Sequence, residues 1–176
     1  MIDQSELDKD TSEREFVITR VVAAPREQVF HAWTDPVQLA QWWGPHDFTN
    51  PVCEVDLRVG GAYRIVMRGP DGTEYPIKGE YGQIAAPARL VMTDNWEEHP
   101  DQWREQLTDN HGNAAEDAVQ EALDEVTFEA EQGGWTRLTI RTIFSSGAVR
   151  DAMLKMGMTE GWSQSLERLS ALVAKK

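Results

Sequence analysis

One amphipathic stripe near the C-terminus constrains the fold of this 176-residue chain more than any other feature. Trp162, Leu166, Leu169 and Val173 recur at the spacing of a single helix face, which predicts a helix over 159–174. At 1.5 Å per residue this helix is about 24 Å long. It is the one long amphipathic helix that the sequence predicts, so it must cover whatever apolar sheet face the rest of the chain forms.

Strand-like segments fill most of the remaining sequence. Alternating or β-branched residues predict strands over 16–22, 52–59, 63–67, 78–85, 89–95, 126–131 and 135–144. Gly-rich or Pro-containing turns at 60–61, 70–72 and 133–134 separate several of them. Because such short connections cannot cross over a sheet, consecutive strands are predicted to pair in antiparallel fashion.

Two short helices are predicted between the first and second strands. Pro25 suits the first position of a helix, where its missing N–H is not needed. Asp35 and Pro36 then end that helix and begin another, with Gln38 at the capping-box position. The predicted class is α+β: a strand, two helices, about six strands and a closing helix, with a curved antiparallel sheet around the long C-terminal helix.

The sequence divides into an arm, one domain and an insertion. Residues 1–14 carry few large apolar side chains and predict a disordered acidic arm. Residues 15–176 predict a single domain. Residues 97–125 are strongly acidic and interrupt the strand pattern, which predicts an insertion with a short helix over 114–123.

Charge and cysteine content exclude several classes of partner. The chain has 17 basic and 30 acidic residues, a net charge of −13, which argues against nucleic acid and anionic membrane surfaces. The acidic N-terminus does not resemble a signal peptide, so we expect a cytoplasmic protein that does not associate with membranes. Cys53 is the single cysteine, which excludes an internal disulfide and a thiolate metal cluster.

Large side chains are abundant where the sheet and the last helix should meet. A twisted sheet cannot close evenly along a straight helix, so core residues or a ligand must fill the gap. Either interpretation suits the aromatic and Met residues, because apolar periodicity predicts burial rather than binding. The candidate cavity residues of this kind are Trp42, Trp43, Phe48, Tyr63, Met67, Tyr81, Trp96, Phe128, Met153, Met158 and Trp162.

Polar candidates are fewer. Glu54 and Arg64 are possible anchors at one end of an apolar pocket, or else a cross-strand ion pair on the solvent face. His46 is either a ligand contact or general base at the cavity entrance, or an exposed loop histidine. His99 and His111 lack recognised metal-ligand spacing. We therefore assign no catalytic residue, no metal and no cofactor from the sequence.

Several motifs together resemble a known family. They are Pro25-x-x-x-Val29-Phe30-x-Ala32-Trp33-Thr34-Asp35-Pro36, Trp42-Trp43-Gly44-Pro45, Gly60-Gly61-x-Tyr63-Arg64, Pro70-Asp71-Gly72 and Gly157-Met158-x-x-Gly161-Trp162-x-x-x-Leu166-x-x-Leu169. This set is similar to stand-alone bacterial START-like domains related to the C-terminal domain of the activator of Hsp90 ATPase. The resemblance covers about 15–176 apart from the insertion. It implies the helix-grip fold with a cavity between sheet and helix, and it implies fold far better than function.

Three functions follow as hypotheses. The first is a protein that binds a small apolar or aromatic ligand in an internal cavity, without established catalysis. The second is a cyclase or hydrolase type of enzyme, which requires at least two ionisable groups to converge in that cavity. The third is a chaperone-associated or homodimeric interaction module, supported by the acidic insertion and by exposed tryptophans at 42–43.

Overall fold

The computed structural model describes residues 4–111 and 121–174. The elements in chain order are η1 (Gln4–Asp8), β1 (Glu15–Val22), α1 (Arg26–Thr34), α2 (Pro36–Trp42), β2 (Thr49–Val55), β3 (Ala62–Arg68), β4 (Glu74–Ala85), β5 (Arg89–Asn95), α3 (Asp101–His111), β6 (Glu121–Ala130), η3 (Gln132–Gly134), β7 (Thr136–Ile143), α4 (Gly147–Lys155) and α5 (Met158–Ala174). None of the helices in these described ranges is long and apolar enough to cross a membrane.

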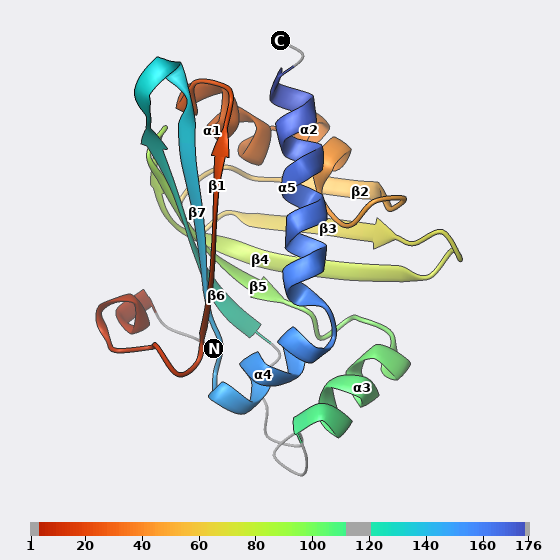
Figure 1. Cartoon of the computed structure of the whole chain (residues 1–176). Helices are drawn as coiled ribbons and strands as arrows, with labels where there is room; N and C mark the ends of the chain where they lie inside the picture. The colour runs from red at the N-terminus through yellow and green to blue at the C-terminus, as the bar shows by residue number, and fades with distance from the viewer. Residues whose placement is uncertain (1–3, 112–120, 175–176) are drawn as a thin grey trace.

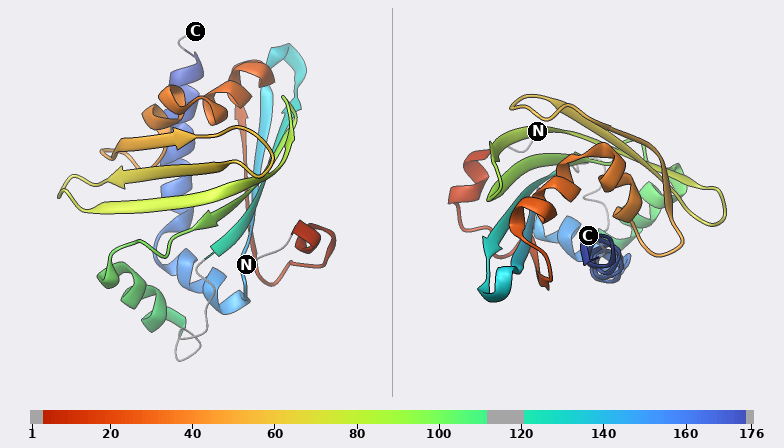
Figure 2. Two further views of the ribbon diagram at one scale, coloured as in Figure 1. Left: turned by 180° about the vertical axis from the view of Figure 1, so that it is seen from behind. Right: turned by 90° about the horizontal axis from the view of Figure 1, so that it is seen from above.

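The strands form one curved antiparallel sheet. Its seven strands run in the order β1-β7-β6-β5-β4-β3-β2, and each neighbouring pair is antiparallel. Seen from above, the sheet curls around α1, α2 and α5, which lie on its concave side (Figure 2). The predicted α+β class and the predicted helix-grip arrangement are both confirmed.

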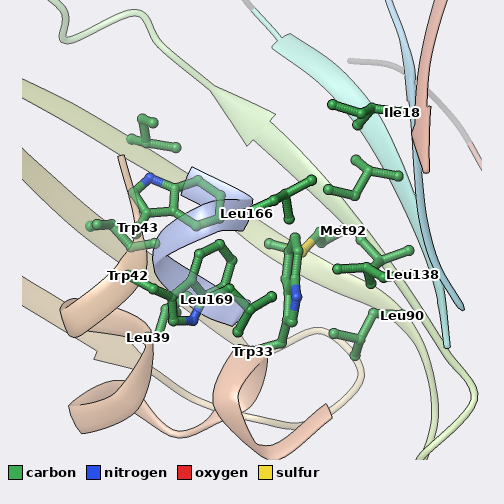
Figure 3. Close-up of a cluster of buried hydrophobic side chains, with 14 of the residues drawn as sticks. Ile18, Trp33, Leu39, Trp42, Trp43, Leu90, Met92, Leu138, Leu166 and Leu169 are labelled. Atoms are coloured by element: carbon green, nitrogen blue, oxygen red, sulfur yellow. The ribbon is translucent and has the colours of Figure 1, made fainter. Parts of the chain in front are cut away.

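The C-terminal helix buries the stripe that the sequence marked. Leu166, Leu169 and Val173 are buried, and they pack in the same cluster as the sheet residues Leu90 and Leu138 (Figure 3). Each fully buried aliphatic side chain of this kind contributes about 1.5–3 kcal/mol relative to exposure. The helix is therefore held against the sheet by its apolar face, as predicted.

The short helices α1 and α2 close one end of the sheet. The side chain of Asp35 accepts a hydrogen bond from the backbone N–H of Gln38 at 3.0 Å, so the predicted cap of α2 is confirmed. Trp42 is fully buried, and its indole Nε1 donates to the carbonyl of Ala32 at 2.9 Å. This bond ties the end of α2 to α1.

One predicted strand ends earlier than expected. The alternation over 52–59 predicted a strand, but β2 ends at Val55, and Leu57 and Val59 are 42% and 65% exposed. The N–H of Asp56 still bonds to the carbonyl of Ala62, and the chain then turns through Gly60, whose φ is +82°. Glycine adopts such a φ without steric cost, so the turn rather than the alternation decides this segment.

The N-terminal segment packs on the sheet from Gln4 onward. Thr11 is only 2% exposed, and its hydroxyl accepts a hydrogen bond from Arg141 on β7 at 2.8 Å. The prediction of a disordered arm over 1–14 is therefore wrong for residues 4–14. The prediction rested on the scarcity of large apolar residues, and it overlooked how the polar side chains of the segment bond to β7.

The acidic insertion contains more regular structure than its composition indicated. Helix α3 begins at Asp101 and packs against α4 at the lower end of the molecule (Figure 1). Strand β6 begins at Glu121, so 121–123 are strand, not the end of the predicted helix over 114–123. The rest of that predicted helix, 114–120, lies outside the described residues.

Candidate functional site

A cavity of about 400 Å³ lies between the concave face of the sheet, the junction of α4 with α5, and α3. It is partly open to solvent, and its volume falls in the ~300–1,000 Å³ range of small-molecule sites. The lining residues are Trp43, Gly44, Pro45, Phe48, Met67, Tyr75, Ile77, Asp94, Trp96, His99, Trp103, Thr142, Phe144, Met153, Met156, Gly157, Met158, Gly161, Trp162 and Ser165.

The junction between the last two helices shapes one wall. Gly157, with a φ of +92°, separates α4 from α5, and side chains of both helices line the cavity. Met153 comes from α4 and Trp162 from α5. Gly161 contributes no side chain, so α5 leaves space beside Trp162. Methionine adapts well to irregular ligand surfaces, which makes this wall suitable for an apolar guest.

Indole rings fix the upper part of the cavity. The ring of Trp162 lies 5.4 Å from that of Trp43, edge to face, and stacks on Trp33 at 6.1 Å. Trp42 packs behind them, with its ring 4.9 Å from that of Trp33. Trp33 and Trp42 thus hold in place the two rings that line the cavity.

Arg168 holds the segment that carries Trp43. Its Nη1 donates to the carbonyls of Trp43, Gly44 and Pro45 at 3.1, 2.9 and 3.0 Å, and its Nη2 donates to that of Gln41 at 3.0 Å. Burial lowers the pKa of the guanidinium. The arginine thereby locks α5 to the end of α2 and fixes the cavity wall between them.

Two carboxyl groups, the half-buried Asp94 and the buried Asp124, meet on neighbouring strands. Asp94 on β5 lines the cavity and forms a side-chain hydrogen bond with Asp124 on β6. Thr142 donates to Asp124 Oδ1 at 2.6 Å. Burial raises the pKa of Asp94 to about 6 and that of Asp124 well above its ordinary value. At neutral pH, Asp124 therefore keeps its proton and donates it to the ionised Asp94.

Asp94 receives little further compensation. The hydroxyl of Tyr63 lies 3.4 Å from Asp94 Oδ1 but only 2.6 Å from the carbonyl of Thr93, which is its better acceptor. Among the described residues, no Lys or Arg forms an ion pair with either carboxyl of the pair. One net negative charge therefore sits at the cavity without a cationic partner.

His99 is a second unusual polar group of the cavity. It is 7% exposed, and neither ring nitrogen has a hydrogen-bond partner among the described residues. Its ring lies edge to face against Trp103 at 4.4 Å and Tyr75 at 5.6 Å. Burial lowers the pKa of His99 to about 4, so the imidazole is neutral at pH 7. The indole Nε1 of Trp96 is likewise buried and unpartnered.

The structure divides the predicted apolar candidates into two sets. Those that line the cavity are Trp43, Phe48, Met67, Trp96, Met153, Met158 and Trp162. Those that lie in the core instead are Trp42, Tyr63, Tyr81 and Phe128. Phe128 is covered by Phe30 of α1, with ring centroids 5.2 Å apart, so α1 packs on the sheet at that end.

The predicted polar anchors lie away from the cavity. Glu54 and Arg64 are opposite each other on β2 and β3, and they line a groove on the other face of the sheet. Arg64 forms an ion pair with Glu98 at 2.6 Å. His46 is exposed, with Nε2 2.8 Å from the carboxylate of Glu167. The solvent-facing interpretation is therefore the correct one for these three residues.

Two further expectations change with the structure. Trp42 and Trp43 are 0% and 6% exposed, so the exposed tryptophans that supported an interaction module do not exist. Burial raises the pKa of Cys53 to about 11, which agrees with a small apolar residue rather than a nucleophile. The described residues hold no cluster of three potential metal ligands. Residues 112–120 of the acidic insertion, which include the potential metal ligand Glu116, lie outside the described residues.

The carboxyl pair is not among the predicted site residues, although the sequence carries a signal for it. Strand alternation places Asp94 on the same face as Leu90, Met92 and Trp96. Asp124 likewise falls between inward apolar positions of β6. A charged residue on an apolar strand face is rare unless it is paired, which identifies it as a candidate site residue.

The comparisons with known proteins agree with this architecture. The family model "Activator of Hsp90 ATPase homolog 1-like protein" matches residues 23–174. The chain belongs to this family. Among curated proteins, none is detectably similar in sequence. The predicted family resemblance is confirmed, and with it the START-like helix-grip fold.

Solved structures of bacterial proteins have the same fold over nearly the whole chain. A crystal structure from Nitrosomonas europaea is 25% identical with a TM-score of 0.75, and the match covers 93% of this chain and 96% of that one. A solution structure from Arthrobacter aurescens is 29% identical with a TM-score of 0.75, covering 96% and 91%. An AHSA1 protein from Silicibacter pomeroyi, 24% identical with a TM-score of 0.68, covers 91% and 97% and supports the fold alone.

Proposed function

We propose that this member of the family binds a small apolar or aromatic molecule in the cavity between the sheet and α5. The supporting observation is the cavity itself, about 400 Å³ in volume and lined mainly by indole, phenyl and methionine side chains. Small-molecule sites are typically concave, mostly apolar and equipped with a few polar groups. The Asp94 carboxyl supplies such a group here, and His99 is a second polar residue of the lining.

A pair of adjacent residues on α4 allows a direct test. Met153 lines the cavity, whereas Leu154 is 38% exposed and does not. Met153→Trp fills part of the volume, and Leu154→Trp adds the same ring outside it. A thermal-shift screen of aromatic metabolites should give ligands that stabilise the wild type and Leu154→Trp but not Met153→Trp. Stabilisation of all three proteins by the same compounds would place binding outside the cavity and refute the proposal.

An acid–base enzyme is a second candidate, favoured by one observation. Asp94, with a raised pKa, and His99, with a lowered one, line the same cavity, which meets the requirement of two converging ionisable groups. The predicted pocket anchors Glu54 and Arg64 and the predicted general base His46 lie elsewhere. Mass spectrometry of any bound ligand after prolonged incubation separates the candidates: a changed mass that Asp94→Asn abolishes favours the enzyme, and an unchanged ligand favours binding alone.

A further inference from the structure

We propose that the ligand carries a cationic amine on an aromatic or apolar body, with the amine seated at the Asp94–Asp124 pair. This inference rests on the proposed function and specifies the class of molecule that the cavity takes. It follows from the charge balance of the cavity, from its ring-lined walls and from two buried polar groups that lack partners.

The carboxyl pair places a charge where the protein does not neutralise it. Asp124 donates its proton to Asp94 and accepts a bond from Thr142, so its own hydrogen bonds are made within the protein. Asp94 has only that proton and the distant Tyr63 hydroxyl, 3.4 Å away. Asp94 is half-buried against the apolar wall, and a carboxylate there loses part of its hydration without gaining an opposite charge, which costs free energy. A ligand ammonium group supplies that charge.

The cavity offers no cationic side chain to an anionic ligand. None of the described residues that line it is Lys or Arg, and its one histidine is neutral at pH 7. The chain as a whole carries a net charge of −13, which repels anions and raises the local concentration of cations. A fatty acid or another carboxylate would therefore meet Asp94 without a compensating group. The charges of the lining therefore favour a cationic ligand over an anionic one.

The aromatic walls suit a cation as well as an apolar body. Trp43, Trp162, Trp103 and Tyr75 all contribute rings to the cavity. The faces of indole and phenol rings attract ammonium groups, by about 0.5–2 kcal/mol each depending on desolvation. The same rings stack on an aromatic ligand body. One guest with an aromatic ring and a protonated amine uses both properties.

Two unpartnered groups point independently to a polar guest. His99 is 7% exposed and Trp96 is 4% exposed, and both residues line the cavity. Their ring nitrogens are covered and have no partner among the described residues. Buried polar atoms are nearly always hydrogen-bonded in folded proteins. The neutral imidazole of His99 has one acceptor nitrogen, which an ammonium N–H can satisfy. The acceptor nitrogen of His99 serves the ammonium end of a ligand once a small side-chain movement uncovers it, whereas the Trp96 N–H, which is only a donor, does not.

Three probes of one shape test the inference. They are 2-(1-naphthyl)ethylamine, 2-(1-naphthyl)ethanol and 1-naphthylacetate, which differ mainly in the charge of the short side arm. Isothermal titration at pH 7.5 should show the amine binding about tenfold or more tightly than the alcohol, which corresponds to about 1.4 kcal/mol, with the acetate weakest. This comparison needs no variant, so it does not depend on the folding of a mutant.

A matched pair of variants then assigns the preference to Asp94. Asp94→Asn should lower amine affinity about tenfold, to the level of the alcohol, and leave alcohol binding unchanged. Glu80→Gln, which removes an exposed carboxylate on the neighbouring strand, should leave the affinities for both the amine and the alcohol unchanged. Equal affinities for amine and alcohol, or tighter binding of the acetate, would overturn the inference and leave the proposed function standing. If none of the three probes binds, both fail.

Discussion

Replacing Asp94 with asparagine should make the protein more stable at neutral pH, contrary to the usual effect of changing a buried residue. Burial raises the pKa of Asp94 from an ordinary 3.8 to about 6. The folded state therefore binds a proton more tightly than the unfolded state. The stability contributed by that protonated form is present below pH 4 and is lost as the pH rises through 6. Above pH 6 the wild type carries the full cost of the buried charge.

The size of this cost follows from the change in pKa. The difference between 3.8 and about 6 corresponds to about 3 kcal/mol. Asp94 faces a partly open cavity, and water there screens part of the charge, so we expect a gain of about 1–3 kcal/mol for Asp94→Asn at pH 8. The asparagine carbonyl still accepts the proton that Asp124 donates, so the hydrogen bond between the two side chains is kept.

Urea denaturation of both proteins between pH 4 and pH 8 measures the effect. The difference in free energy of unfolding between Asp94→Asn and wild type should be near zero at pH 4 and should grow as the pH passes 6. Glu80→Gln, at an exposed position, should give a difference within about 0.5 kcal/mol across the range. A variant that is less stable than wild type at pH 8 would show that Asp94 has a cationic partner, and the charge argument would be refuted.

Three other perturbations have defined outcomes. Arg168→Met should lower the free energy of unfolding in urea by about 2–3 kcal/mol, because it leaves several backbone carbonyls unpaired; no loss would mean that water replaces the guanidinium. Leu169→Ala, at a fully buried position, should lower the free energy of unfolding by about 2–5 kcal/mol. Leu172→Ala, at a half-buried position, should lower it clearly less, and equal losses would contradict the packing of α5. Naphthylethylamine affinity, followed by calorimetry, should weaken as the pH falls through 6 and Asp94 takes up a proton. Asp94 is the group of this site expected to titrate in that range, because Asp124 stays protonated, Tyr63 stays neutral and the pKa of His99 is about 4. An affinity that does not change between pH 5 and 7.5 would therefore contradict binding of the amine by Asp94.

The elements of the fold were predictable because their patterns are local. The stripe of Leu166, Leu169 and Val173 identifies α5, and Asp35 with Pro36 identifies the start of α2. Segment ends were less predictable, because they depend on contacts distant in sequence. Thr11, for example, is held by Arg141 on β7, and no pattern within residues 1–14 shows that partner.

The site was only partly predictable for a related reason. Trp42 and Trp43 are adjacent in the sequence, yet one fills the core while the other lines the cavity, because α2 ends between them. Periodicity predicts that both are buried and does not reveal where the interior stays open. For Asp94 and Asp124 the pattern is more informative, because strand alternation alone places both on the inward face. Their pairing, however, depends on the register of β5 with β6, which only the structure gives.

Methionine methyl groups provide the most direct test of ligand binding in the cavity between the sheet and α5. Met67, Met153, Met156 and Met158 line the cavity, whereas Met92 lies in the packed core. In a protein labelled with ¹³C at the methionine methyls, titration with naphthylethylamine should shift the signals of those four residues and give nuclear Overhauser contacts to the naphthyl protons, with Met92 unchanged. Saturable binding that leaves all four signals in place would contradict the account.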